Sequence, residues 1–534
     1  MLCKAIILAG LAFSGSGSPD GDDPVDTLSI EGIVVNSKLQ RYASSLSLRV
    51  IPANELKTGK QLLLSDMLEP LSNVTVNSYG LGGISLASLR GLGSYHTAIL
   101  WNGFNLQSSM NGGVNLSNIP VNFVDQMAIQ YGGNGALFGS GAIGGTIHLD
   151  NSLELGKGHS AEIYQTYGSF SSHFSGVNYT YSGLKIASST RVFYAETEND
   201  FRFHNIAAIG KPYQNQVNAN SSKLGLMQNL VYQFSVSNKL SASVWLQNSF
   251  FRYPPMMTAY TNGENDDYNF IRSAVQWQSN HKKVDFNVKG GYFNDRQEYR
   301  NPGTGESSNH ISSIGNVETE AIVKLVPNQK IEAGINICYE KVNSTNYATI
   351  KNRTRPSASI SYKYDDADGR YNFFVGLREE MVETETNPIT WSMGTRIKLF
   401  KVLSMRGNIS RNYRIPAMND LYWINGWGNP DLKPEQGYGQ ELGLDYLLLA
   451  KASSLNTKLT VFNNNVTDWI IWLPTGSVWR PQNYKKVWAR GIDLSVNINI
   501  NYNNWQWGVD LMGTGTISTT EKSNIKSEVG KQLP

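Results

Sequence analysis

The sequence predicts a transmembrane β-barrel of antiparallel strands, preceded by a small mixed α/β domain. Three observations carry this prediction. From residue 159 onward, apolar and polar residues alternate with a period of two, most clearly in Ile492–Tyr502. Short turns alternate with longer polar and aromatic segments, which is the pattern of an up-and-down barrel. The 534-residue chain has no run of 18 or more apolar residues, so it offers no membrane-spanning helix.

The composition excludes several other classes of protein. A net charge of +3 is too small to argue for binding to nucleic acid. Aromatic residues make up 11% of the chain, with 27 Tyr and 12 Trp, which suits polar-faced strands with aromatic girdles. The seven histidines form no paired metal motif, and no catalytic constellation emerges. We therefore predict a protein that is not an enzyme and holds no cofactor or metal.

The N-terminus predicts export from the cytoplasm. Lys4 precedes the apolar run 5–13 and four small residues, which is the order of a secretory signal, assigned here to residues 1–18. Because Cys3 lies in this signal, Cys338 has no partner for an internal disulfide. A leader follows at residues 19–35, and its small, acidic first part, Pro19–Asp26, is expected to be disordered.

The leader also contains an extended segment with alternating apolar residues. It begins with Asp26, Thr27, Leu28, Ser29 and Ile30. Such a segment behind a flexible leader has the form needed to add a strand to the sheet edge of a partner protein. The alternative is an ordinary first strand of the domain that follows.

Residues 36–151 predict a mixed α/β domain. Ile51–Leu56 has the pattern of a strand passing into a helix, and Leu62, Leu63, Met67 and Leu68 fall at helical spacing with Pro70 beyond them. The domain closes with Ile119–Asp150, where seven glycines between positions 132 and 145 predict a tight, enclosed turn. Its Gly-x-Gly-x-x-Gly spacing also fits a dinucleotide site, but an alternating strand follows where that motif requires a helix.

This closing stretch resembles the plug of TonB-dependent outer-membrane receptors. Phe138–Ile147 is similar to the family's plug ending, and Ile119-Pro120 is similar to the start of the same motif. Leu86–Gly93 followed by Thr97–Phe104 resembles the family's Arg-Gly strand end and the strand after it. Further along, two barrel signatures of the family resemble Asn412–Tyr422 and Gly428–Glu435.

One departure from the family pattern concerns the attachment of the plug. The chain has Tyr131-Gly132-Gly133 where relatives usually have Arg-Gly-Pro. If that arginine anchors the plug in relatives, the anchor in this chain must come from elsewhere.

The resemblance implies a plug inside a 22-stranded barrel in the outer membrane of a Gram-negative bacterium. It also implies that Asp26–Ile30 is a TonB box, paired by the TonB energy-coupling protein. Outer-membrane lipid would surround the barrel, and an associated surface lipoprotein is a further partner compatible with the family.

The barrel prediction covers residues 159–534. Short turns are expected near Gly183, Asn238, Asn280, Asn328, Asp366, Phe400, Ala450 and Asn503. Longer loops are expected at 196–220, 251–270, 295–312, 341–356, 379–391, 412–438 and 463–488. This gives about 17 strands. Because single-chain bacterial barrels have even counts, we expect an incomplete barrel that lacks roughly five strands of the family's architecture.

Ligand contacts are predicted at two places. The first is Gln107, Ser108, Ser109, Met110 and Asn111, which the resemblance places at the outward-facing apex of the plug. Its amide and hydroxyl groups suit a neutral polar ligand, and Met110 offers an adaptable apolar contact; a solvated loop is the alternative. The second is a set of loop aromatics, for which the alternative is a membrane-interface girdle: Tyr253, Tyr422, Trp423 and Trp427.

The passage from residue 100 to 121 is most similar to vitamin B12 receptors, which share its Leu-Ser-x-x-Pro step after a polar apex. Cobalamin is therefore the first candidate cargo, and a siderophore or haem is the alternative. The apex lacks the Lys or Arg that often receives an anionic chelate. Alternatives of another class are a surface adhesin on a plugged barrel and a soluble β-sandwich lectin.

Two acidic runs have features of calcium loops. Asp366-Ala367-Asp368-Gly369 fails the pattern at its first and twelfth positions, so a hairpin turn is favoured. Glu264–Asp267 lacks the spacing of calcium ligands, so a solvated outer loop is favoured there.

Overall fold

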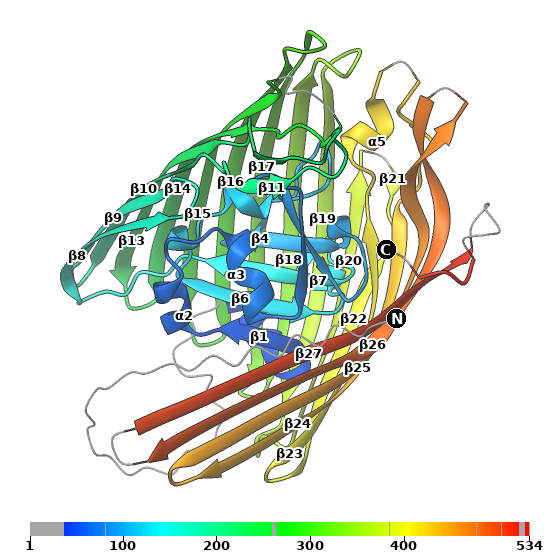
Figure 1. The fold of residues 1–534 in the computed structure, drawn as a ribbon. Coiled ribbons are helices and arrows are strands. Elements are labelled where there is room, and N and C mark those ends of the chain that lie inside the picture. Colours follow the sequence, from blue (N-terminus) through cyan, green and yellow to red (C-terminus); the bar gives the residue numbers. More distant parts are fainter. Residues whose placement is uncertain are drawn as a thin grey trace.

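Long antiparallel strands surround a compact group of N-terminal elements (Figure 1). The computed structural model describes residues 37–80, 82–258, 263–383, 385–424, 426–476, 478–502, 505–522 and 529–532. The predicted signal and the leader with Asp26–Ile30 lie outside the described residues. Within the described ranges, no helix combines the length and the apolar character needed to cross a membrane.

The N-terminal elements form the plug. Its main sheet has the order β1-β6-β7-β4-β5, in which β4 and β7 are parallel and the other pairs antiparallel. A separate pair joins β2 to β3. The plug consists of α1 (Ser37–Tyr42), β1 (Ser47–Ile51), α2 (Ala53–Thr58), α3 (Leu64–Leu71), β2 (Val74–Ser78), β3 (Ser85–Leu89), β4 (Thr97–Trp101), β5 (Phe104–Asn105), β6 (Gln126–Tyr131), α4 (Gly135–Phe138) and β7 (Gly145–Asp150).

The glycine-dense turn is tight and enclosed, as predicted. Helix α4 precedes the Gly-x-Gly-x-x-Gly motif at Gly139–Gly144 and strand β7 follows it, which is the reverse of a dinucleotide-binding context. At Gly145 the backbone φ is +155°, and an added Cβ would lie 2.4 Å from the carbonyl oxygen of Gln130, so only glycine fits. Every residue of β7 is buried, because the plug sheet is covered on both faces.

The predicted end of one plug helix was wrong. Helix α3 begins at Leu64 and buries Leu64, Met67 and Leu68, but Pro70 lies inside its last turn instead of beyond it. A single residue follows Pro70 in the helix, so the proline marks the helix end without preventing the final turn.

Among the described residues, seventeen long strands form the barrel, in agreement with the predicted number. Consecutive strands pair antiparallel, with β21 (Glu385–Thr386) as a short addition to β20. They are β8 (Gly158–Gly168), β9 (Ser172–Ser182), β10 (Ile186–Thr197), β13 (Ser221–Ser235), β14 (Asn238–Arg252), β15 (Asn265–Asn280), β16 (Val284–Asn301), β17 (Glu306–Val326), β18 (Gln329–Ser344), β19 (Lys351–Asp365), β20 (Tyr371–Val382), β22 (Thr390–Phe400), β23 (Leu403–Arg414), β24 (Glu435–Ala450), β25 (Ser453–Thr475), β26 (Val478–Tyr502) and β27 (Trp505–Lys522).

The barrel wall is apolar outside and polar inside. On β16, Phe286 and Tyr292 are 42% and 50% exposed, whereas Asn287 and Lys289 between them are 4% and 3% exposed. The same inversion holds on β18, where the outward Ile335 is exposed and the inward Glu340 is buried. This is the arrangement of a barrel embedded in lipid. It excludes the soluble sandwich, whose apolar face would point inward.

Two predicted loops are mostly strand. Of the segment 295–312, only the four residues 302–305 between β16 and β17 form a turn, and 463–488 is almost entirely β25 and β26. These hairpins carry β-favouring Thr, Val, Tyr and Trp residues, and pairing continues along them. The shorter hairpin β11 (Arg202–His204) and β12 (Tyr213–Asn215) rises from another outer loop.

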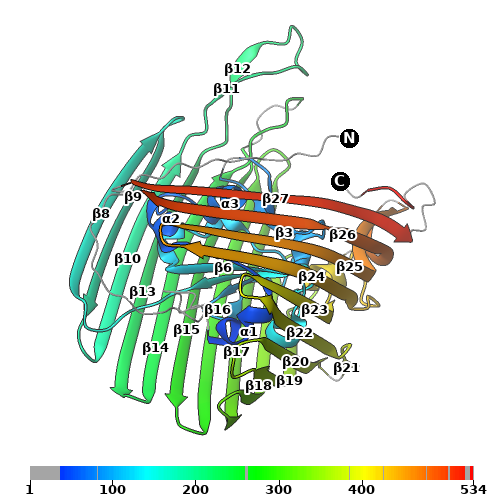
Figure 2. The same cartoon turned by 90° about the horizontal axis from the view of Figure 1, so that it is seen from below.

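The two ends of the barrel differ. The short turns, such as 327–328 and 401–402, lie at one end, which in outer-membrane barrels faces the periplasm. Helix α1 and strand β1 lie toward this end (Figure 1). The longer connections and α5 (Met418–Tyr422) lie at the other end. Figure 2, a view from below, shows the barrel strands around the plug.

Candidate functional site

The predicted plug apex meets the barrel at the long-loop end. The backbone N–H of Met418 donates to the carbonyl of Ser109, and that of Asn419 donates to the carbonyl of Met110, both at 2.9 Å. The Met110 side chain is 8% exposed and packs against Val342 and Met418. Ser109 and Met110 therefore join the plug to α5, and the Met110 side chain is not presented to solvent.

The other apex residues have polar groups nearer the surface. The Gln107 amide accepts a bond from Asn105 at 2.9 Å and donates to the Tyr95 carbonyl at 3.2 Å. The Ser108 hydroxyl accepts a bond from the Met110 N–H at 3.2 Å, and Asn111 is exposed. A ligand-binding role for this segment stays a prediction.

Three of the four predicted loop aromatics gather beside the apex. The rings of Trp423 and Trp427 stack with centroids 6.4 Å apart, and Trp472 of β25 meets Trp423 edge-on at 6.0 Å. The Lys351 ammonium lies 4.8 Å from the centroid of the Tyr422 ring. These rings form an aromatic wall at the outer mouth, suited to a flat or apolar ligand surface.

Tyr253 lies apart from this wall. Its ring contacts Phe251 and Tyr299, and its hydroxyl donates to Asp266 at 3.4 Å. The structure thus places it among β14, β15 and β16, on a different part of the wall from Tyr422.

The anchor that the sequence left open is Arg90. Its guanidinium lies 2.9 Å from Glu441 and 3.0 Å from Asp493 on the barrel wall, and all three side chains are buried. It also lies 4.6 Å from the centroid of the Phe462 ring. Gly132 makes room for this contact, because a Cβ there would lie 1.4 Å from a Glu441 oxygen. Arg90 is the arginine of the Arg-Gly strand end that resembles the family pattern.

A second anchor lies nearer the outer mouth. Glu435 is fully buried and accepts two bonds from Arg414 at 2.7 and 2.8 Å. Its other contacts are the backbone N–H of Ile470 at 2.7 Å and Nε2 of His96 from the plug at 2.5 Å. The Trp469 ring covers His96 edge-on at 4.3 Å. One carboxylate therefore joins the plug to three barrel strands.

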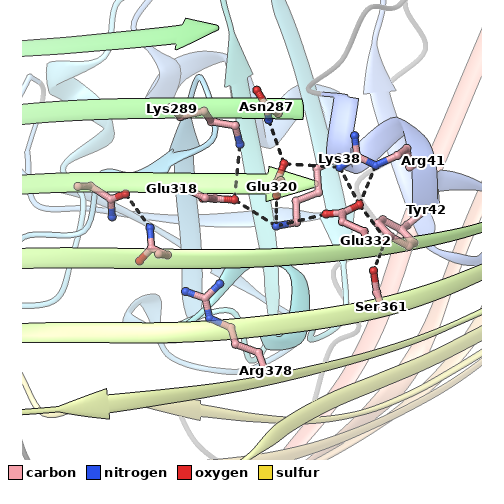
Figure 3. A network of polar contacts seen from close by, with 12 residues as sticks. Lys38, Arg41, Tyr42, Asn287, Lys289, Glu318, Glu320, Glu332, Ser361 and Arg378 are labelled. Carbon is pink, nitrogen blue, oxygen red and sulfur yellow. Dashed lines mark hydrogen bonds and ion pairs between the residues drawn. The ribbon is translucent and has the colours of Figure 1, made fainter. Parts of the chain in front are cut away.

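The third anchor is on α1, directly behind the leader (Figure 3). Lys38 Nζ lies 2.6 Å from Glu320 and 3.8 Å from Glu332. Arg41 lies 2.8 Å from Glu332, and the Tyr42 hydroxyl donates to the same carboxylate at 3.1 Å. We call Lys38, Arg41 and Tyr42 with their barrel partners the α1 latch.

The α1 latch keeps its charge. Burial alone would lower the pKa of the Lys38 ammonium, but Glu320, Glu318 and Glu332 outweigh it and raise that pKa above its usual value. Glu318 lies 3.3 Å from Lys38 and 3.7 Å from Lys289, so it links the latch to the barrel interior. The latch is therefore not a proton-operated switch at physiological pH.

A cavity of about 120 Å³ lies between the apex and the α1 latch. Gln107, Ser108 and Ser109 line its apical part, and Lys38 lines the same cavity. Its barrel side carries charged and thiol groups, namely Lys289, Glu318, Cys338, Glu340, Arg353, Arg355, Arg378, Glu380 and Arg414. The outer contact region and the latch thus border one space.

The calcium alternatives find no support in the geometry. Asp366 accepts a bond from the Arg370 N–H within a hairpin turn, and Glu264 accepts one from Asn301. Over the ranges that the structure describes, no group of three or more His, Cys, Asp or Glu side chains is placed to hold a metal.

Comparison with known proteins gives consistent results. Residues 78–534 match the family model described as TonB dependent receptor-like, beta-barrel. The chain is 26% identical over 494 residues to the vitamin B12 transporter BtuB of Vibrio vulnificus strain YJ016, covering 86% of this chain and 74% of the relative. It is 24% identical over 465 residues to the protein of the same name from Photobacterium profundum, covering 84% and 72%.

Solved structures share the fold. The siderophore receptor PirA from Acinetobacter baumannii superposes with a TM-score of 0.72 at 16% identity, covering 92% of this chain and 82% of that one. The copper transporter OprC gives a TM-score of 0.72 at 14% identity, covering 92% and 83%.

Proposed function

Since the chain belongs to the TonB-dependent receptor family of the Gram-negative outer membrane, we propose that it imports a scarce ligand of the cobalamin type into the periplasm. The ligand binds at the plug apex and the aromatic wall. TonB then pairs with the leader at Asp26–Ile30 and pulls on the plug. A siderophore or haem is the alternative cargo.

The observation that carries this proposal is the position of the α1 latch. It is the first described element behind the leader, it is attached to the barrel by buried ion pairs, and it borders the same cavity as the apex. A pull on the leader would act on these ion pairs before any other plug contact. Ligand contact at the apex would act on the opposite side of that cavity.

The choice of cobalamin rests on two further observations. Three relatives at 22–26% identity are vitamin B12 transporters by name. The apex segment Gln107–Asn111 has no charged side chain, which suits a large ligand with amide groups better than an anionic chelate.

Deleting Asp26–Ile30 from the full-length receptor is expected to reduce uptake to background while leaving ligand binding at the cell surface unchanged. The physical reason is that strand pairing with TonB needs this segment, whereas the outer mouth does not. Uptake and surface binding of radiolabelled cobalamin measure the two effects. Deleting residues 19–23, five residues from the same leader, is the matched control. Uptake that survives the first deletion would refute TonB-driven import through this segment, whereas surface binding without uptake in the unmodified receptor would favour the adhesin.

Replacing Trp423 and Trp427 by alanine is expected to weaken cobalamin binding about tenfold for each ring removed, because an aromatic contact of this kind contributes about 1.4 kcal/mol. Calorimetry on the detergent-solubilised receptor measures the affinity. Trp505 and Trp507, which stack at the same 6.4 Å on β27, provide a control pair away from the mouth. Absence of cobalamin binding at micromolar concentration in the unmodified receptor would eliminate this cargo and leave the iron chelate or haem.

A further inference from the structure

A second, larger cavity lies at the short-turn end. It has a volume of about 710 Å³ and separates β1 of the plug from the inner faces of β19 and of β22 to β27. Figure 1 shows β1 on the side of the plug toward these sloping strands. The plug residues that line it include Leu39, Tyr131 and the segment 46–50. The cavity thus borders the part of the plug that follows the α1 latch.

The charged side chains that line this cavity do not balance. Five are cationic, namely Arg49, Lys363, Arg396, Arg406 and Lys458, and three are acidic, namely Asp365, Asp445 and Asp493. Each acid already faces a cation: Asp365 pairs with Lys363 at 3.0 Å, Asp445 pairs with Arg406 at 3.1 Å, and Asp493 shares Arg90 with Glu441. Arg49 pairs with Asp510 at 2.5 Å.

Of the five cations that line the cavity, Arg396 and Lys458 have not yet been assigned a partner. Arg396 donates to the Ser404 hydroxyl at 3.3 Å, and Lys458 donates to the Leu48 carbonyl at 3.4 Å. Within the described part of the chain, neither has a carboxylate at ion-pair distance. Asp445 is the acid whose charge acts on both, and it is already paired with Arg406. These two cations therefore make the cavity electropositive.

Two features show that this charge is built into the cavity. Both cations line the cavity on the inner face of the barrel, and an ionisable group without a counter-charge inside a membrane protein usually marks a ligand pathway. In addition, the Nε of Arg49 is buried without a hydrogen-bond partner on the same cavity wall. An oxyanion in the cavity would supply the missing counter-charge and accept these N–H groups.

We propose that this cavity is an exit-side subsite that binds an oxyanion, a phosphate or carboxylate group of the transported ligand, after it has passed the apex. The inference rests on the proposed import function and adds a second binding site to the path of the ligand. Cobalamin carries a phosphodiester and many iron chelates carry carboxylates, so either cargo would present such a group. The subsite lies between β1 and the barrel wall and retains the cargo on the periplasmic side of the plug.

The test uses the intact receptor in detergent and pyrophosphate as the probe. Pyrophosphate titrated into the unmodified receptor is expected to bind, and the double variant Arg396→Gln, Lys458→Gln is expected to bind at least about tenfold more weakly, because two charge-assisted contacts are lost. The charge-retaining double variant Arg396→Lys, Lys458→Arg is expected to bind within about threefold of the unmodified receptor, which separates charge from folding. The control Arg296→Gln, Lys324→Gln removes two cations outside the cavity.

Uptake measurements complete the test. In the double glutamine variant, the maximal uptake rate is expected to fall while cobalamin affinity at the outer surface stays unchanged. Equal pyrophosphate affinity in all variants would overturn the subsite, even if cobalamin uptake is normal. Pyrophosphate binding that depends on Arg396 and Lys458, in a receptor that does not take up cobalamin, would support the subsite and refute the proposed cargo.

Discussion

Replacing Lys38 by methionine is expected to open the α1 latch, with trypsin then cutting after Arg41 about a hundredfold faster than in the unmodified receptor. The ammonium of Lys38 is surrounded by three carboxylates within 3.8 Å. Removing one member of a buried ion pair costs about 3–5 kcal/mol, which is sufficient for local opening of a six-residue helix at this rate. Mass spectrometry of the N-terminal fragments measures the cut.

Lys60 provides the control for this experiment. It pairs with Glu162, which is about half exposed, and an exposed pair contributes about 0–1 kcal/mol. Lys60→Met should therefore leave the cleavage rate after Arg41 within about fivefold of the original. Equal protection of Arg41 in the Lys38 and Lys60 variants would show that the ion pairs do not hold α1 in place.

Replacing Arg90 by alanine is expected to cause the largest loss of stability, about 3–5 kcal/mol, because Glu441 and Asp493 then remain buried without a cation. The stacking over Phe462 is also lost. Thermal unfolding in detergent, followed by the heat-dependent shift in gel mobility, measures the effect. The unfolding temperature of Arg90→Lys should lie between those of Arg90→Ala and the unmodified receptor, because lysine keeps the charge but loses the fork geometry of the guanidinium.

Two further variants test the explanation for Arg90. Gly132→Ala should also lower the unfolding temperature of the receptor, although it removes no charge, because the added Cβ displaces the Glu441 carboxylate from Arg90. Arg300→Ala breaks an exposed pair with Glu298 and should leave the unfolding temperature nearly unchanged. An unfolding temperature for Arg90→Ala equal to that of the Arg300 variant would refute the anchor.

The barrel was predictable because lipid and lumen impose opposite demands on alternate residues. Residues such as Phe286 and Lys289 could be assigned to faces from the sequence alone. The loop prediction at 463–488 failed for a related reason. Strands β25 and β26 have 23 and 25 residues, which at about 3.3 Å per residue extend far beyond an apolar band about 25 Å tall. Pairing continues there, but the apolar signal stops at the membrane surface.

The anchors could not be found from the sequence. Arg90 lies 403 positions from Asp493 along the chain, and Lys38 lies 282 positions from Glu320. A single sequence gives no distance between such residues. The Arg-Gly motif drew attention to Arg90, but its role became visible only when the plug was placed inside the wall. The aromatic residues at 422–427 could be singled out from the sequence because three rings lie within six positions of one predicted outer loop, and their role in binding stays a prediction.

The joint between the apex and α5 has a consequence for how such receptors diversify. Both of its hydrogen bonds use the main-chain carbonyls of residues 109 and 110 as acceptors. Backbone groups are the same whatever side chain is present, so mutations can alter the chemistry offered to a nutrient while the attachment persists. Receptors with this arrangement can therefore change ligand specificity while the attachment of the plug to the barrel stays the same.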